Sequence, residues 1–117
     1  MAWTPERGDV VWISMDPSVG HEQSVGHEQS GRRPALVLSP GAYNGKVGLA
    51  ILCPITSQVR GYPFEVPIPE GLPVQGVVLS DQAKSLDWRS RRAELACKAP
   101  PESTAEVLLR LTTLVGP

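Results

Sequence analysis

The sequence has little of what several protein classes require. Its 117 residues include two cysteines, three tryptophans and one phenylalanine, and the formal net charge is −1. No apolar run approaches the roughly 18 residues that cross a bilayer. The first residues, MAWTPER, lack the basic and then apolar segments of a signal peptide. We therefore expect no membrane association and a single domain over residues 1–117 that works in the cytoplasm.

The two cysteines do not form a metal-binding or disulfide pattern. Cys53 and Cys97 lie far apart in the sequence and neither belongs to a CxxC motif. In a reducing compartment, isolated cysteines usually serve as small buried hydrophobic residues. We interpret both cysteines in this way, and we expect no metal ion and no cofactor.

Basic residues are concentrated in the second half of the chain although the overall charge is nearly zero. The late cluster consists of Lys84, Arg89, Arg91, Arg92 and Lys98. A second, smaller group, Arg32 and Arg33, follows a polar segment that begins at Pro17. A nearly neutral protein can still carry a face that binds phosphate groups. A solvated basic surface explains the same pattern, and composition alone leaves the two interpretations open.

Short apolar segments separated by glycine and proline predict a sheet-rich fold. Asn44-Gly45 separates two of these segments and predicts a hairpin-type connection. Frequent turn signals between short strands favour a barrel or a strongly curved sheet. The expected strands cover residues 8–16, 34–39, 47–53, 63–68, 76–79 and 92–97.

The end of the chain changes to a helical period. Apolar residues from Val107 to Val115 recur at helical spacing, whereas Glu102 and Glu106 lie off that stripe. Pro100-Pro101 suits a helix start, and Gly116-Pro117 ends the helix. We expect this helix to cap the sheet or to join a subunit interface.

One polar segment contains a direct repeat. The sequence VGHEQS occurs at residues 19–24 and again, unchanged, at residues 25–30. Six residues are too few for a repeat architecture, and a longer surface loop costs little closure entropy. The repeat therefore indicates a tolerated duplication, which supplies two sets of His and Glu.

Residues in and after this segment have the chemistry that metal-free RNA cleavage requires. The reaction needs groups that move protons and a cation beside the phosphate. His21 or His27 and Glu22 or Glu28 can transfer protons, and the permanently charged Arg33 can hold phosphate oxygens. Each residue type is also common on ordinary surfaces, so these residues alone predict only a small β-rich domain.

Nearly the whole chain, from Arg7 to Gly116, resembles the MazF/PemK (Kid) family of toxin endoribonucleases. No single motif is specific, but together and in this order they are. The resembling segments are 7–12 (RGDVVW), 16–17 (DP), 26–29 (GHEQ), 31–40 (GRRPALVLSP), 54–58 (PITSQ), 61–66 (GYPFEV), 76–82 (GVVLSDQ) and 84–89 (KSLDWR).

The resemblance implies a mainly β fold with a C-terminal helix, an SH3-like β-barrel of the MazF/PemK/CcdB type. It also implies a homodimeric toxin that inhibits translation and growth by cutting single-stranded RNA at selected sequences. The cut leaves a 2′,3′-cyclic phosphate and a 5′-hydroxyl and needs no metal. A MazE-like antitoxin is the implied partner, and DNA is bound only indirectly, through the antitoxin.

The resemblance also suggests the site residues. Arg33 is expected to stabilise the phosphate and Thr56 to orient it with its hydroxyl. The spacing to Arg33 favours Glu28 as the catalytic carboxylate, whereas the spacing to Asp16-Pro17 favours Glu22. We expect Glu28, because a catalytic group must be in register with the other catalytic groups. Trp88 can stack an RNA base or belong to the core, and both interpretations stay open. The expected substrate-binding residues are His27, Arg32, Ser57, Gln58, Arg60, Asp81, Gln82, Lys84, Trp88 and Arg89.

Two other functions fit the same fold. One is a toxin that binds a topoisomerase and performs no chemistry, since a fold alone does not determine function. The other is a nucleic-acid-binding barrel that shifts RNA in a salt-dependent way and leaves it intact. A catalytic set of Arg33, Thr56 and a loop carboxylate favours the nuclease.

Overall fold

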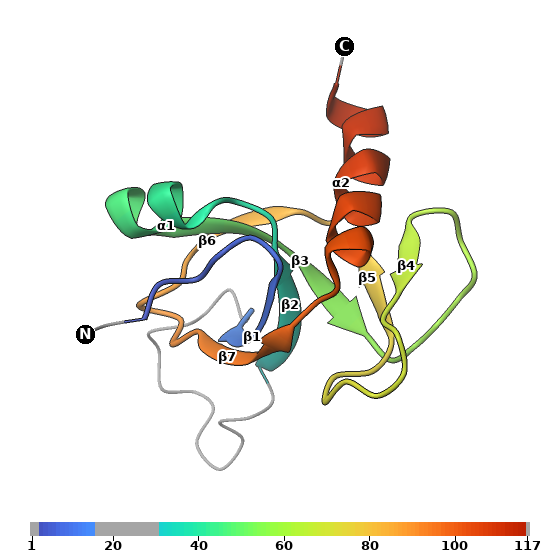
Figure 1. Ribbon diagram of the computed structural model, residues 1–117, viewed down its shortest axis with the longest axis horizontal. Coiled ribbons are helices and arrows are strands. Elements are labelled where there is room, and N and C mark those ends of the chain that lie inside the picture. Colours follow the sequence, from blue (N-terminus) through green and yellow to red (C-terminus); the bar gives the residue numbers. More distant parts are fainter. Residues whose placement is uncertain (1–2, 16–30, 117) are drawn as a thin grey trace.

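The computed structural model describes residues 3–15 and 31–116 and has the expected mainly β architecture with a C-terminal helix (Figure 1). Between β2 and β3 the chain forms helix α1 (Gly41–Val47), and it ends in α2 (Pro101–Val115). The strands are β1 (Asp9–Ser14), β2 (Arg32–Val37), β3 (Leu49–Thr56), β4 (Glu65–Pro67), β5 (Val77–Leu79), β6 (Lys84–Asp87) and β7 (Glu94–Lys98).

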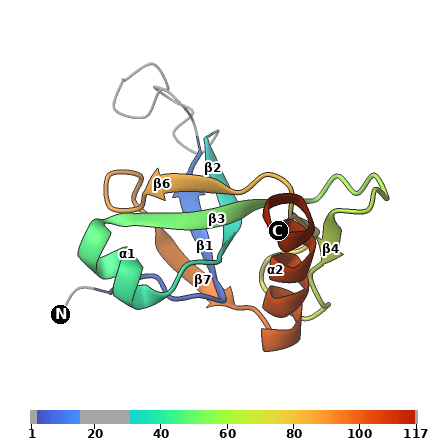
Figure 2. The same cartoon turned by 90° about the horizontal axis from the view of Figure 1, so that it is seen from above.

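The strands form one curled antiparallel sheet in the order β4-β5-β3-β2-β1-β7, and β6 pairs with β3 off this path. In the described ranges, β4 and β7 are the ends of the path, so the sheet is barrel-like without being closed. The central strand β3 is the longest and runs from α1 toward the region of α2 and β4 (Figure 2). Its last residue, Thr56, therefore lies far from α1.

Two clusters of apolar side chains fill the fold. The first contains Val10, Leu36 and Cys53 and extends to Val107 on α2. The second contains the intervening residues Val11 and Ala35, because side chains alternate between the two faces of a strand. Trp88 belongs to the second cluster and is 5% exposed. Both faces of β1 and β2 are thus buried over part of their length.

Helix α2 covers the core with one face, as far along the helix as Leu111. Val107 is fully buried, and Leu108 and Leu111 pack against the first cluster. Further along, Leu114 and Val115 are 52% and 73% exposed. The prediction of a helix is confirmed, and its apolar stripe continues beyond the part that the core uses.

The sequence prediction is wrong for residues 41–47, which form α1 and not a hairpin connection. The Asn44 side chain points inward, where its amide donates to the carbonyls of Pro5 (2.8 Å) and Ser39 (3.0 Å). These tertiary contacts outweigh the local Asn-Gly turn preference. The chain reverses instead at Gly48, whose φ of 85° is left-handed and favours glycine.

Several strands also depart from the predicted bounds. β2 begins at Arg32 and not at residue 34, and β3 covers Leu49–Thr56 and not residues 47–53. β6 was not predicted because its sequence, KSLD, is mostly exposed and lacks apolar alternation. Its backbone pairs with β3 from Leu49 to Leu52. β7 begins at Glu94 and not at residue 92, because Arg92 has a φ of 60° and turns the chain.

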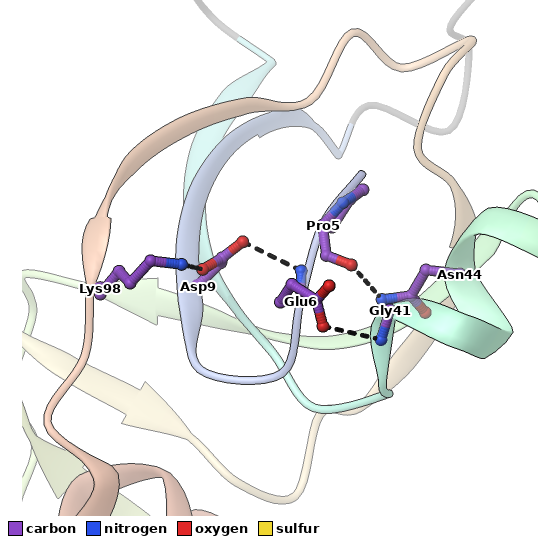
Figure 3. Close-up of polar contacts among 6 residues, drawn as sticks. All are labelled: Pro5, Glu6, Asp9, Gly41, Asn44 and Lys98. Carbon is purple, nitrogen blue, oxygen red and sulfur yellow. Dashed lines mark hydrogen bonds and ion pairs between the residues drawn. The ribbon is translucent and has the colours of Figure 1, made fainter. Parts of the chain in front are cut away.

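A chain of polar contacts, which we call the N-terminal clamp, ties the first residues to α1 and β7 (Figure 3). It consists of Pro5, Glu6, Asp9, Gly41, Asn44 and Lys98. The Asp9 carboxylate, fully buried, accepts from Lys98 Nζ at 2.6 Å and from the Glu6 amide at 2.9 Å. The Glu6 side chain accepts from the Gly41 amide at 3.1 Å.

The cysteines fit their predicted role as free hydrophobic residues. Cys53 is fully buried and Cys97 is half-buried, and they form no disulfide. Burial, with a smaller effect of the Asp81 charge, raises the pKa of Cys53 to about 12.

Neither helix in the described part of the chain has the length and the apolar character that a membrane-spanning helix needs.

Candidate functional site

The strand register brings Arg33 toward Thr56. β2 pairs with β3 through Ala35↔Pro54, Leu36↔Cys53 and Val37↔Leu52. The paired residues end at Ala35 and Pro54, and the same antiparallel register, continued by two residues, would set Arg33 opposite Thr56. The register therefore directs the end of β2 that carries Arg33 and the end of β3 that carries Thr56 toward the same region of the sheet.

Arg33 is exposed, and its guanidinium makes no hydrogen bond or ion pair with the rest of the described chain. Its backbone is held in place by pairing with Ile13 of β1. An arginine with a fixed backbone and free donors can bind an external anion. Its planar, permanently charged group can fork onto two phosphate oxygens.

Thr56 lies at the edge of a hollow of about 390 Å³. The Thr56 hydroxyl accepts a hydrogen bond from the Gln58 amide at 3.1 Å, which leaves its own proton available as a donor. We call this feature the Thr56 hollow. Its lining consists of Thr56, Gln58, Arg60, Tyr62, Glu65, Leu79 and Gln82.

Gly76 lies directly against the backbone of Thr56. A Cβ atom at position 76 would lie 2.1 Å from the carbonyl oxygen of Thr56. The φ of Gly76, 123°, is also one that residues with side chains rarely adopt. Only glycine therefore allows β5 to approach the end of β3, where Thr56 pairs with Val77.

The wall of the hollow is held by two hydrogen-bonded ties. The Glu65 carboxylate, 7% exposed, accepts from the amides of Arg60 (2.9 Å) and Gly61 (2.8 Å). The Tyr62 hydroxyl donates to the Asp81 carboxylate at 2.8 Å. This hydrogen bond is the largest of the effects that raise the pKa of Tyr62 above its ordinary value.

Several predicted site residues gather at this hollow. Gln58, Arg60 and Gln82 line it together with Thr56. Ser57 is exposed directly after Thr56, and Asp81 faces Tyr62. The side chains of Gln58 and Arg60 make no hydrogen bonds within the described residues, so their donors remain free for a ligand.

Trp88 and Arg89 do not gather there, and the structure favours the core interpretation of Trp88. The buried Trp88 ring packs edge-on against Trp3, and its Nε1 donates to the Asn44 carbonyl at 2.9 Å. The Arg89 guanidinium covers the same ring at 4.3 Å from its centroid. A ring in contact with protein in this way is not free to stack an RNA base. Lys84 is exposed at the start of β6, opposite Leu52 and outside the hollow's lining.

Arg32 also has an internal role in place of the predicted contact with substrate. Alternation along β2 turns it away from the face of Arg33. Its guanidinium pairs with Glu94 at 3.1 Å and donates to the carbonyl oxygens of Arg91 and Trp12. These bonds join the ends of β1, β2 and β7. The Arg32-Arg33 pair is thus divided between a structural residue and a free one.

His27 and Glu28 lie outside the described residues, as do both copies of the VGHEQS repeat. The described residues contain no group of three His, Cys, Asp or Glu side chains arranged to hold a metal ion.

Tyr62, Glu65 and Leu79 line the hollow and had no predicted role, and neither had Gly76, which lies against the Thr56 carbonyl. All four residues fall within the motif segments 61–66 and 76–82. Phe64 and Val66 flank Glu65, and Gly76 precedes an apolar run. Neither local pattern specifies a contact with backbone atoms of a distant segment.

Comparison with protein families identifies the chain over almost its full length. A model of the PemK-like, MazF-like toxin of type II toxin-antitoxin system matches residues 6–115. The endoribonuclease toxin MazF of Escherichia coli K12 is 40% identical over 114 residues, which cover 97% of this chain and 96% of that protein. The endoribonuclease toxin ChpB of the same strain is 42% identical over 115 residues, covering 94% of this chain and 93% of that protein.

Solved structures agree with the sequence comparison. MazF of Deinococcus radiodurans (Form-I) superposes with a TM-score of 0.86 at 52% identity, covering 99% of this chain and 100% of that chain. The MazE-MazF structure (Form-II) from the same organism gives a TM-score of 0.84 at 50% identity, with 98% of both chains covered. Fold, sequence and near-complete coverage agree, and this chain belongs to the PemK-like, MazF-like toxin family of type II toxin-antitoxin systems.

Proposed function

We propose that this chain is an endoribonuclease toxin that cuts single-stranded RNA at selected sequences without a metal ion. The observation that carries the proposal is the free, exposed guanidinium of Arg33, whose strand register leads to the hydroxyl of Thr56 at an open hollow. Membership of a family whose relatives are endoribonuclease toxins supports it independently.

The proposed reaction is an attack of the ribose 2′-oxygen on the adjacent phosphorus. A base removes the 2′-hydroxyl proton, the new O–P bond closes a 2′,3′-cyclic phosphate, and the bond to the 5′-oxygen breaks. The departing oxygen takes up a proton and becomes a 5′-hydroxyl. Arg33 stabilises the negative phosphorane, because donors aimed at developing charge contribute most to such steps.

Thr56 and a loop carboxylate complete the proposed set. The Thr56 hydroxyl donates to a phosphate oxygen and fixes its orientation. Glu28 transfers a proton, and its neighbour His27 contacts the RNA. We assign Arg33 to charge stabilisation, because a guanidinium keeps its charge and is a poor proton donor.

The test is an assay on unpaired RNA in the presence of EDTA. The pure protein is expected to cut the oligonucleotide, and mapping of the ends should show 2′,3′-cyclic phosphate and 5′-hydroxyl. Thr56→Val keeps the shape of the side chain and should slow cleavage about tenfold or more through loss of one hydroxyl donor. Binding of a topoisomerase without RNA cleavage would instead establish the non-catalytic alternative.

We further propose that the chain works as a homodimer in the cytoplasm. The exposed apolar residues on α2, Leu109 (61%), Leu114 (52%) and Val115 (73%), support an interface on the surface of the helix that the core leaves uncovered. Light scattering should give twice the chain mass, and Leu114→Lys should lower it. A monomeric wild-type chain that still cleaves RNA would contradict the dimer.

A MazE-like antitoxin is the proposed partner and the only link to DNA. An acidic, disordered segment is expected to fold over the basic face that binds RNA and to inhibit cleavage. MazE-MazF structures of relatives support this proposal. The complex should weaken as salt rises, and a competing RNA should displace the antitoxin. Simultaneous binding of both would exclude occlusion as the mechanism.

A further inference from the structure

The segment between β3 and β4, residues 57–64, forms one side of the Thr56 hollow without regular secondary structure. It carries Gln58 and Arg60, whose free side chains are candidates for contact with RNA. Its own amides have few partners in the sheet, so its shape depends on side chains that reach into it. Glu65, the first residue of β4, is the side chain that does so.

Each oxygen of the Glu65 carboxylate accepts a hydrogen bond from a backbone amide of this segment. Oε2 accepts from the Arg60 amide at 2.9 Å, and Oε1 accepts from the Gly61 amide at 2.8 Å. A carboxylate with both oxygens bound to backbone amides is poorly placed to take a proton from substrate. Although Glu65 borders the hollow, its contacts are those of a residue that orders a loop.

The position of Glu65 is itself fixed from the other side. Its amide donates to the Tyr62 carbonyl at 3.2 Å, which closes the turn before β4. Its carbonyl accepts from Arg110 of α2 at 3.3 Å, and Arg110 also bonds the Pro63 carbonyl. Arg110 is oriented by Glu106, 2.7 Å away on the same helix. The end of the loop is therefore anchored to α2, and Glu65 transmits that anchoring to Arg60 and Gly61.

We propose that Glu65 is a positioning residue for RNA binding, which holds the loop carrying Gln58 and Arg60 at the distance from Thr56 that the RNA strand requires. This inference rests on the proposed nuclease function and deepens it. Glu65 acts on substrate affinity through the loop and takes no part in the chemical step.

The test is Glu65→Gln in the folded, full-length protein. The substitution keeps the shape but sets an N–H donor against the Arg60 amide, which is also a donor. The KM for a single-stranded RNA should rise about tenfold, while kcat should change by less than about threefold. Glu70→Gln is the matched control, because Glu70 is exposed and lies outside the hollow.

Limited trypsin digestion gives a second readout that needs no activity. Release of the loop should accelerate cleavage after Arg60 about tenfold. Residues 16–30 contain no Lys or Arg, so trypsin cannot cut the repeat segment and obscure this result. If Glu65→Gln folds poorly, Gly61→Ala tests the same loop. Gly61 has a φ of 83°, and a Cβ there meets nothing within 4 Å.

The outcomes separate the inference from the proposed function. A higher KM together with faster cutting after Arg60 supports the inference. An unchanged KM overturns it, whether or not trypsin cuts faster, and so does a loss confined to kcat. A wild-type chain that leaves RNA intact would overturn the proposed function itself, and the trypsin result would still report whether Glu65 orders the loop.

Discussion

The N-terminal clamp and the Thr56 hollow use polar side chains in opposite ways. In the clamp, Asp9 and Asn44 are fully buried, and their side chains bond to other parts of the protein (Figure 3). Around the hollow, Arg33, Gln58 and Arg60 are exposed, and their side chains donate to no other described residue. Hydrogen-bond donors without a partner inside the protein can bind an external ligand. Polar groups that already have such partners hold parts of the fold together.

The hollow nevertheless has a structural layer of its own. Gly76, Glu65 and the Tyr62–Asp81 pair hold its backbone, and the residues they hold present free groups to solvent. Substitutions in the clamp should therefore change stability alone. Substitutions in the free groups should change activity alone, and those in the supporting layer should change both.

The largest effect is expected from Arg33→Ala, which tests the free groups. Cleavage of single-stranded RNA should slow by about a hundredfold to a thousandfold, as for other lost donors to a developing oxyanion. The melting temperature should stay the same because the exposed guanidinium makes no hydrogen bond or ion pair with a described residue. Arg32→Ala is the matched control one position away. It removes the ion pair with Glu94 and the hydrogen bonds to the carbonyls of Arg91 and Trp12, and it should change the rate by less than about threefold.

Equal losses of activity in the two arginine variants would contradict this division. So would a loss of stability confined to Arg33→Ala, because it would indicate that the guanidinium is used inside the fold.

The second effect belongs to the clamp. Asn44→Ala should lower the free energy of unfolding by about 3 kcal/mol, since buried partners on Pro5 and Ser39 lose their hydrogen bonds. Urea denaturation measures this change, and the rate of RNA cleavage per folded molecule should remain at the wild-type value. Lys46→Ala, an exposed change on the same helix, should affect neither quantity.

The comparison also shows what the sequence could and could not predict. Apolar periodicity predicted α2, and turn signals predicted most of the strands, because both depend on local residue order. The Asn44-Gly45 pair was wrongly assigned to a hairpin connection, since its actual role depends on residues 5 and 39, which no local pattern connects to it. Strand β6 escaped prediction because backbone pairing with β3, and not burial, holds it.

The candidate site divides in the same way. The family motifs identified Thr56, Gln58 and Gln82, which line the hollow, and Arg33, which the register brings toward it. They assigned Arg33 to catalysis and Arg32 to substrate binding, but only the register of β2 reveals that the two side chains occupy opposite faces. The roles of Gly76 and Glu65 are contacts with backbone atoms, and such contacts leave no distinctive residue pattern.

A smaller effect is expected from Gly76→Ala, which tests the supporting layer. The added Cβ must displace the Thr56 carbonyl and accept a strained φ, at a cost of about 2 kcal/mol in unfolding free energy. Because Thr56 moves, kcat should also fall. Gly71→Ala is the matched control, with a φ of 97° and no atom within 4 Å of the added Cβ. It should reproduce the strain and leave kcat unchanged, and equal kcat in the two variants would exclude a positioning role for Gly76.

The smallest effect concerns the Tyr62–Asp81 tie and its dependence on pH. The hydrogen bond to Asp81 raises the pKa of Tyr62. A group whose pKa is raised by folding stabilises the fold below its unfolded pKa, and it loses that contribution as the pH rises through the folded value. The tie should therefore persist through the neutral range and break only in strongly alkaline solution. Asp81→Asn should lower the pKa of Tyr62, measured from phenolate absorbance in a pH titration.

Tyr62→Phe identifies which transition belongs to Tyr62, since Tyr43 is the other tyrosine of the chain. That variant should also cut slightly faster after Arg60 with trypsin, and by less than Glu65→Gln, because an exposed tie contributes less than a buried carboxylate with two amide partners. A larger acceleration in Tyr62→Phe than in Glu65→Gln would reverse this ranking. The exposed Tyr62–Asp81 hydrogen bond would then hold the wall of the hollow more strongly than the buried Glu65 does. The hollow would in that case differ more from the clamp, whose contacts are buried.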